Sequence, residues 1–509
     1  MAIDASRPDL TVGVIGTGAM GRGIAQVAAA GGMQVLMTDT RPGAAEEARD
    51  FIARMIARAA EKGSMTRDEA TGAVNRIRIV GGPADMKPCH AVIEVIVENL
   101  EAKQKLFAEL EGIVAPECIL ATNTSSLSVT TIASKLKTPQ RFAGFHFFNP
   151  VPLMKLVEVI EGLRTEPWVA DALMVIGRRM TREPVRLKDA PGFLVNQVGR
   201  GFTLEASHLV YEGIASFVDV DRVMRDVGGF RMGPFELMDL TGLDVTHPAS
   251  ELIYNQFFQE PRYRPNLIMR SRYEAGVLGR KTRHGFNEYD AEMKPIVAPE
   301  PAPPAARPDR VWISPAEPQG RTVLLELLAK LGVQPEPGAK PSPGALILVT
   351  PVGEDATHCA VEQGLDPRRT MAVDTLFPVV KRRTIMGTPI TDAAYRDAAH
   401  GLLASDGVPV TVCRDSPGFI AQRIVAMIVN IGCSIAQSRT AQPADIDKAV
   451  TLGLNYPNGP FRFGDVLGPE RVYKVLSGMY RIYGDPRYRP SIWLTRRARL
   501  GVSLLTPEP

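Results

Sequence analysis

The chain has 509 residues, of which 59 are lysine or arginine, 56 are aspartate or glutamate, and 45% are hydrophobic. This near-neutral charge, with no run of basic residues, argues against a nucleic-acid-binding protein and against attachment to an anionic membrane. No apolar run approaches the ~20 residues that span a bilayer. Five scattered cysteines without metal-ligand spacing, and a start without a secretory signal, predict a cytoplasmic protein without a metal site, long enough for three or four domains.

The first part of the chain, residues 1–190, alternates short β-branched runs with helical stretches. Runs at 10–15, 34–38 and 91–97 are separated by helical segments, a pattern that predicts a parallel, doubly wound α/β sheet. A charged helical stretch at 45–80 is too long for a simple crossover, so we expect it to project as a helical hairpin. Strand signals end near residue 190, and residues 191–290 are predicted to form an all-helical domain.

The rest of the chain repeats this plan in reduced form. A proline-rich segment at 291–308 predicts an extended linker. Beyond it, the motif KDAPGF at 188–193 returns as RDSPGF at 414–419, and GPF at 233–235 returns at 459–461, both 226 residues later. We therefore expect a second helical domain at 413–509, preceded by a degenerate Rossmann-like α/β segment at 309–412. The second helical domain should pack on the first within the chain, because the apolar stripes of each need a partner surface.

A glycine-rich turn follows the first predicted strand. Gly16, Gly18 and Gly21 have the GxGxxG spacing of a dinucleotide-binding turn, and Asp39 ends the next strand, 23 residues after Gly16. A carboxylate there accepts hydrogen bonds from ribose hydroxyls and repels a 2′-phosphate, so NAD is predicted over NADP. Two alternatives stay open: Arg41 holding a 2′-phosphate, and a glycine turn without a ligand. In its full context the pattern predicts a Rossmann-like, NAD-binding domain at 1–190.

A histidine and a glutamate stand in two neighbouring apolar strands. His146 ends the run at 142–147, just before a proline-bounded turn, and Glu158 lies within the run at 156–160. A buried carboxylate needs a partner, and His146 is the nearest candidate. A histidine held by a glutamate is kept in one tautomer and made more basic, as abstraction of a hydroxyl proton requires. The alternative is a buried pair that serves only the structure.

Two polar segments are candidates for lining the same cleft. One is the stretch that contains Thr124, Ser125 and Ser126, directly after a predicted strand, and the other begins a helix at Asn196. A hydroxyl and an amide are the groups that would fix the reacting oxygen of a substrate near His146. The alternative for these turn-forming residues is that they only cap helices.

Together these segments resemble the NAD-dependent L-3-hydroxyacyl-CoA dehydrogenases, in particular the long bacterial 3-hydroxybutyryl- or 3-hydroxyadipyl-CoA type. Matching motifs run in family order across residues 10–290, among them GTGAMGRGIAQ at 16–26, HFFNP at 146–150, KDAPGFLVN at 188–196 and GPFELMD at 233–239. The resemblance implies NAD as cofactor, an acyl-CoA substrate, and a place in fatty-acid β-oxidation or phenylacetate catabolism. It leaves the acyl chain length and the oligomeric state open, a homo-oligomer being possible.

The resemblance also implies roles for single residues. His146 would be the general base and Glu158 its partner, while Ser125 and Asn196 would contact the substrate. Lys62, on the charged hairpin, would meet the CoA. The residues expected to contact NAD are Gly16, Gly18, Gly21, Asp39, Glu98, Lys103, Asn149 and Lys281.

The second half departs from the family pattern. Where a second HFFNP motif should fall, the chain has Asp374 in the sequence DTLFP, and Gln422 stands at the position that answers to Asn196. The segment 349–354 takes the place expected for a glycine fingerprint but lacks its spacing. One active site per chain is therefore predicted. Two rival functions stay open, an NAD-dependent sugar-acid dehydrogenase of the gulonate type and a non-catalytic NAD-binding protein.

Overall fold

The computed structural model describes residues 3–508, which form two compact units. One unit runs to Gln197 and also contains Ser438–Leu454, and the other contains Val198–Gln437 together with the chain from Asn455 onward. The predicted domains are continuous stretches of sequence, whereas the first unit also includes residues 438–454 from the second helical domain. No helix within residues 3–508 combines the length and the hydrophobicity needed to cross a membrane.

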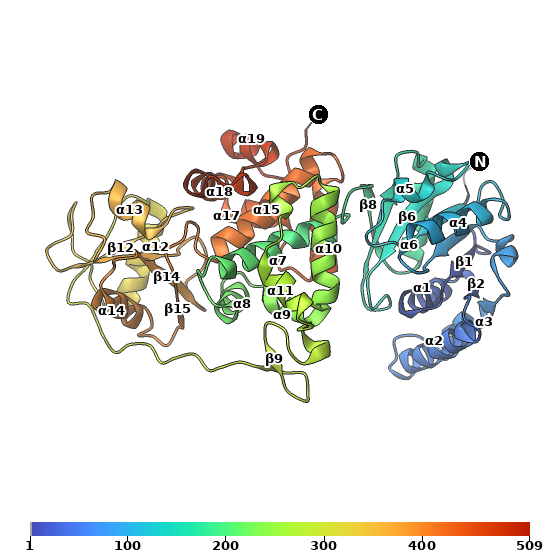
Figure 1. Cartoon of the computed structure of the whole chain (residues 1–509), viewed down its shortest axis with the longest axis horizontal. Coiled ribbons are helices and arrows are strands. Elements are labelled where there is room, and N and C mark those ends of the chain that lie inside the picture. The colour runs from blue at the N-terminus through green and yellow to red at the C-terminus, as the bar shows by residue number, and fades with distance from the viewer. Residues whose placement is uncertain (1–2, 509) are drawn as a thin grey trace. The chain divides into compact units, whose positions relative to one another are not determined.

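The first unit is built on one eight-stranded sheet with the strand order β3-β2-β1-β4-β5-β6-β7-β8. Strands β1, β2, β6 and β8 of this sheet are labelled in Figure 1. All neighbouring strands are parallel except the antiparallel pair β6 and β7. Its two-sided apolar strands confirm the predicted doubly wound fold. The strands are β1 (Thr11–Ile15), β2 (Gln34–Thr38), β3 (Ile77–Ile79), β4 (Ala91–Glu94), β5 (Ile119–Thr122), β6 (Phe142–Phe147), β7 (Leu156–Glu161) and β8 (Glu183–Lys188).

The helices of this unit include the predicted charged hairpin, formed by α2 and α3. The hairpin does not project freely, because Ile52 and Ile56 of α2 are buried in the same apolar core as Ala25 and Ala28 of α1. Its charged residues therefore occupy the outer face of a packed layer. The helices are α1 (Ala19–Ala30), α2 (Ala44–Glu61), α3 (Arg67–Asn75), α4 (Leu100–Glu111), α5 (Val129–Ala133) and α6 (Pro167–Arg179).

Two series of five helices follow the same order and confirm the duplication read from the motifs. The first helical copy consists of α7 (Val195–Tyr211), α8 (Phe217–Asp226), α9 (Pro234–Thr241), α10 (Leu243–Gln256) and α11 (Leu267–Glu274). The second helical copy consists of α15 (Ala421–Gln437), α16 (Pro443–Leu454), α17 (Pro460–Leu467), α18 (Pro469–Tyr483) and α19 (Ile492–Leu500).

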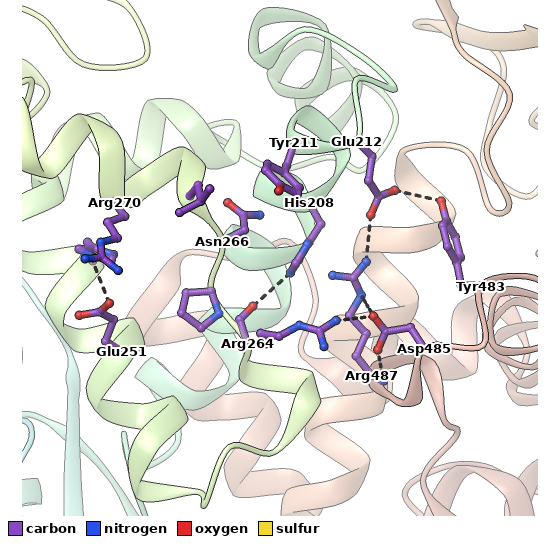
Figure 2. Close-up of a pocket in the computed structure, with 13 residues that line it drawn as sticks. His208, Tyr211, Glu212, Glu251, Arg264, Asn266, Arg270, Tyr483, Asp485 and Arg487 are labelled. Carbon is purple, nitrogen blue, oxygen red and sulfur yellow. Dashed lines mark hydrogen bonds and ion pairs between the residues drawn. The ribbon is translucent and has the colours of Figure 1, made fainter.

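Within the second unit, α7 of the first helical copy packs directly on α15 of the second. Helices α7 and α15 approach so closely at Gly201 that a Cβ there would lie 3.0 Å from the backbone of Ile428. Beside this crossing, the fully buried Arg423 of α15 pairs with Glu205 of α7 at 2.7 Å. Figure 2 shows the outer part of this buried ionic network, in which Glu212, directly after α7, is bound by Tyr483 at 3.0 Å and by Arg487 at 3.0 Å.

The second unit also holds a five-stranded sheet with the order β11-β12-β13-β14-β15. Its strand pairs are parallel, parallel, antiparallel and parallel, which is the pattern of β4 to β8 in the first sheet. The degenerate segment therefore keeps the last five strands and lacks counterparts of β1, β2 and β3. Its elements are β11 (Val311–Ile313), α12 (Pro318–Lys330), β12 (Leu346–Val349), α13 (Ala356–Glu362), β13 (Thr370–Val373), β14 (Arg383–Gly387), α14 (Ala393–Leu403) and β15 (Val410–Cys413).

This alignment corrects the expectation for the segment 349–354. It follows β12, the counterpart of β5, so it corresponds to the polar turn that begins near Asn123 and not to the glycine turn after β1. Sequence spacing alone misplaced it, because the strands that carry the glycine turn are missing from the second copy altogether.

The proline-rich linker is extended, as expected, but it is anchored along the second unit (Figure 1). It begins as a short hairpin of β9 (Glu288–Tyr289) and β10 (Pro295–Ile296). Arg222 of α8 then donates to the carbonyl of Ala298 at 2.9 Å and pairs with Glu300 at 3.2 Å. Arg382, next to β14, pairs with the same glutamate. The linker is therefore held both by the first helical copy and by the degenerate α/β segment.

Candidate active site

The turn after β1 contains three glycines, and each is required for a different structural reason. Gly16 has a φ of 96°, and a Cβ there would lie 2.5 Å from the carbonyl oxygen of Val95. A Cβ on Gly21 would lie 1.9 Å from the carbonyl oxygen of Gly16, so helix α1 packs on the turn only with glycine there. Gly18 has nothing within 4 Å of its Cβ position and leaves open space over the N-terminus of α1. This geometry fits a pyrophosphate bound by helix amides.

Asp39 at the end of β2 turns its carboxylate toward this turn. It accepts hydrogen bonds from the amide and the hydroxyl of Thr17, at 2.7 and 2.9 Å, and from the amide of Arg41 at 3.0 Å. Partial burial opposes ionisation of Asp39, but these hydrogen bonds outweigh it and lower its pKa. The guanidinium of Arg41 pairs with Glu47 at 2.6 Å. The carboxylate of Asp39, and not the guanidinium of Arg41, is the group held against the glycine turn.

His146 and Glu158 face each other across the antiparallel pair β6 and β7. Nδ1 of His146 lies 2.7 Å from Oε2 of Glu158, and the two residues are 5% and 0% exposed. The other carboxylate oxygen accepts hydrogen bonds from the backbone amides of Leu194 at 3.0 Å and Val195 at 3.1 Å. The predicted contact is present, and the amides at the start of α7 hold Glu158 in place as well.

This arrangement determines which nitrogen of His146 is available for chemistry. A carboxylate accepts, so Nδ1 carries the proton and donates it to Glu158, which leaves Nε2 as the basic nitrogen. The rings of Phe148 and Phe193 flank the imidazole, with centroids 4.5 and 5.6 Å away. The pair is built to accept a proton at Nε2 in an apolar setting.

The polar turn after β5 is organised around Glu98. One oxygen of Glu98 accepts from the hydroxyl of Thr124 at 2.6 Å, the hydroxyl of Ser126 at 2.8 Å and the amide of Ser125 at 3.1 Å. Burial works against the charge, but these hydrogen bonds and nearby Lys103 lower the pKa of Glu98. Thr124 and Ser126 thus bind Glu98, while Ser125 keeps an exposed side chain.

Lys103 on α4 is buried, a position that spacing did not reveal. Its ammonium lies 2.6 Å from Glu94 and 3.3 Å from Glu98, and its side chain is 1% exposed. Glu94 in turn accepts from the hydroxyl of Thr122 at 2.7 Å. An acidic residue inside β4 is the sequence signal that such a lysine must be nearby, since a buried carboxylate needs a partner.

The other predicted residues occupy separate places. Asn196 is the second residue of α7, directly after the amides that hold Glu158, and Asn149 is exposed just after β6. Lys281 belongs to the second unit, where its ammonium pairs with Asp244 at 2.6 Å.

Lys62 lines a cavity of about 590 Å³ in the first unit, between the helices α1 and α2 and the segment 149–153. Arg22 and Arg58 line the same cavity, and the guanidinium of Arg22 lies 3.9 Å above the ring of Phe51. Three cationic side chains beside an apolar floor suit a phosphorylated ligand with a ring system. A second cavity, of about 580 Å³, lies beside the buried ionic network of the helical copies (Figure 2), and none of the predicted site residues line it.

Comparison with known proteins agrees with this geometry. The model of the 3-hydroxyacyl-CoA dehydrogenase NAD-binding domain matches residues 11–190. The model of the C-terminal domain of the same family matches twice, at residues 192–289 and 418–503. The second match falls on the second helical copy.

One curated relative and one solved structure match nearly the whole chain, and a shorter relative matches about half of it. A 3-hydroxyadipyl-CoA dehydrogenase of Escherichia coli K12 is 36% identical over 96% of this chain and 98% of its own length. The crystal structure of a 3-hydroxybutyryl-CoA dehydrogenase from Escherichia coli K12 superposes with a TM-score of 0.85, at 34% identity, over 97% of this chain and 99% of that one. A probable 3-hydroxybutyryl-CoA dehydrogenase of Bacillus subtilis is 42% identical over 54% of this chain and 96% of its own length.

These matches do not favour a sugar-acid dehydrogenase. They agree with the glycine turn, the carboxylate of Asp39 beside it and the buried pair of His146 and Glu158. The chain belongs to the 3-hydroxyacyl-CoA dehydrogenase family and is an NAD-dependent oxidoreductase with two copies of the family's C-terminal domain.

Proposed function

We propose that this enzyme oxidises L-3-hydroxyacyl-CoA to 3-ketoacyl-CoA with His146 as the general base and Glu158 as its partner. The observation that carries the assignment is the 2.7 Å contact from Nδ1 of His146 to Glu158, which leaves Nε2 basic. Bound NAD supplies the acceptor for the hydride that leaves C3 of the substrate. As C3 loses the hydride, Nε2 of His146 takes the hydroxyl proton, and the C3–O bond becomes a carbonyl.

Glu158 acts through His146. Its negative charge stabilises the imidazolium that forms when Nε2 takes the proton, and its contact with Nδ1 keeps the ring in one orientation. The amides of Leu194 and Val195 fix the carboxylate itself. Ser125 and Asn196 are assigned to the substrate, where a hydroxyl and a side-chain amide would orient the reacting oxygen toward the base.

The cofactor assignment uses both ends of the NAD molecule. Gly16, Gly18 and Gly21 provide the pyrophosphate turn, and Asp39 is assigned to the adenosine ribose. Glu98 is assigned to the nicotinamide half. The buried Lys103 supports this half by holding Glu98, while Asn149 and Lys281 complete the set by family resemblance.

The substrate assignment uses the cavity at Lys62. Arg22, Arg58 and Lys62 surround it, and phosphates of CoA are the ligand of matching charge. The names of the relatives support a short acyl chain or a 3-hydroxyadipyl chain. We place the enzyme in the cytoplasm, where reducing conditions suit its five buried cysteines.

The test is NADH oxidation followed at its absorbance band with three substrates. Acetoacetyl-CoA, 3-ketoadipyl-CoA and a long-chain 3-ketoacyl-CoA should be reduced with different kcat/KM, the first two being favoured. L-gulonate with NAD should give no NADH. Turnover of the sugar acid without turnover of any ketoacyl-CoA would overturn the assignment.

A further inference from the structure

The outer edge of the first sheet, at strand β8, is covered by a segment from the second helical copy. Strand β8 is the last strand of that sheet, and its amide at Lys188 donates to the carbonyl of Thr440 at 2.8 Å. Leu187 forms an antiparallel bridge with Ala441, and the carboxylate of Asp445 accepts from the amide of Arg186. These contacts fasten the start of α16 to the edge of the sheet that carries the acid–base pair.

Helix α16 then runs across β7 and β8 and ends in close contact at Gly453. A Cβ on Gly453 would lie 2.8 Å from Cγ2 of Val195 and 2.9 Å from Cδ2 of Leu156. These separations are shorter than side-chain carbons tolerate, so glycine is what lets α16 approach this far.

Both neighbours of Gly453 belong to the support of Glu158. Leu156 lies two residues before Glu158 on β7 and so points to the same face of the sheet. The amide of Val195 is one of the two that bind Oε1 of Glu158, at 3.1 Å. Any shift of Val195 away from α16 moves a donor on which the position of the carboxylate depends.

We propose that Gly453, in the second helical copy, is a positioning residue for Glu158, and that α16 completes the active site of the first half. The proposal rests on the role of the His146 and Glu158 pair given above. It assigns to the degenerate half a part in catalysis that needs no second active site. Gly453 acts through Val195 and touches no reacting atom.

The test is Gly453→Ala in the full-length enzyme. Alanine is the better helix former, so α16 itself should stay folded, while the added methyl pushes on Val195. We expect kcat to fall by about 10- to 100-fold, as small misplacements of catalytic groups do. The Kd for NADH should stay within about twofold, because the glycine turn and Asp39 are untouched. The concentration of active sites is measured by NADH titration, so that misfolded protein does not enter the calculation of kcat.

A second substitution makes the test specific. Val195→Ala removes both γ carbons that the new methyl would meet, so the double variant with Gly453→Ala should recover most of the kcat lost by Gly453→Ala alone. Asp445→Ala, which loosens the start of α16 without filling the contact, should lower kcat in the same direction by less. A merely structural contact would lower the thermal stability without this recovery of kcat.

The matched control is Gly464→Ala on α17. Its new Cβ would lie 2.2 Å from Leu504 and 3.1 Å from Val429, so it is a still more crowded glycine, without a link to Glu158. It should leave kcat per NADH site unchanged. Equal kcat losses in the two glycine variants, or no loss at Gly453→Ala, would overturn the proposal. Glu158→Gln, measured alongside, separates the outcomes: full turnover in that variant would overturn the proposed mechanism instead.

Discussion

The two halves of the chain place different residues at one position of the same framework. In the first sheet His146 lies opposite Glu158. In the second, the register that pairs Val373 with Ile385 brings Asp374 opposite Thr384, and the amide of Asp374 donates to the carbonyl of Thr384 at 2.9 Å. The acid–base pair of the first half is therefore an aspartate and a threonine in the second.

In the second half, the position that corresponds to His146 is also occupied by hydrogen bonds within the protein. Gln422, which answers to Asn196, donates to Asp374 at 2.8 Å and to the carbonyl of Pro351 at 3.2 Å, and it accepts from the amide of Gly353 at 3.0 Å. Asp374 is 4% exposed. The second half therefore keeps the strand pairing and the helix start although the acid–base residues are replaced. The sheet needs only apolar strands, whereas catalysis needs two particular side chains.

The largest expected difference between the halves is in turnover. His146→Gln should keep NADH binding and lower kcat by about 10²- to 10⁴-fold, because a general base is typically worth that much. Glu158→Gln should also lower kcat strongly, because the ring of His146 loses the carboxylate that orients it. Asp374→Asn and Gln422→Ala should leave kcat as it is. Steady-state reduction of acetoacetyl-CoA by the four variants decides this, and near-full turnover in His146→Gln would contradict the mechanism.

The next largest difference concerns the cofactor. The second sheet lacks counterparts of the strands that carry the glycine turn and Asp39, so calorimetric titration should find one NADH per chain. Asp39→Ala should weaken NADH binding and narrow the preference over NADPH, because a 2′-phosphate no longer meets a like charge. Two NADH sites per chain, or equal kcat/KM for NADH and NADPH in the unmodified enzyme, would contradict the comparison.

The smallest effect is on stability. Burial raises the pKa of Asp374 from 3.8 to about 6, despite the hydrogen bond from Gln422. Since the native pKa is the higher one, ionisation costs the folded state free energy above pH ~4, and the cost grows up to pH ~6 and is constant beyond. By the usual conversion it reaches at most about 3 kcal/mol at pH 7.5.

Asp374→Asn removes this ionisation. It should therefore raise the thermal midpoint at pH 7.5 and raise it less at pH 5, where the folded aspartate is already largely protonated. Scanning calorimetry at the two pH values measures the difference. An equal shift at both would show that packing, and not charge, sets the effect.

Much of the first half could be predicted because its signals are local. The spacing of Gly16, Gly18 and Gly21 and the position of Asp39 follow from the backbone geometry of a single strand, turn and helix. The pair of His146 and Glu158 followed from one burial argument applied to adjacent strands. The burial of Lys103 required knowing that α4 lies over β4, which no pattern within α4 reveals.

The second half was harder to predict because its sites depend on partners far along the chain. The motif repeat gave the duplication but not which strands were lost, so the segment 349–354 was assigned to the wrong turn. Nor does any periodicity in α16 show that it covers β8 instead of joining the other helices of its copy. Edge strands accept a partner through backbone groups, which leave no mark in the side-chain pattern.

The buried ionic network between the helical copies has a consequence for the history of the chain. Arg423 pairs with Glu205 and Glu212, whereas the positions 226 residues away from these three hold Gln197, Ile431 and Ser438, which carry no charge. In an assembly of two identical subunits every substitution appears twice, so such a one-sided pairing cannot arise. A single chain that carries both copies is free of that constraint. Each face of the interface can then change alone, and the two faces here carry different, complementary side chains.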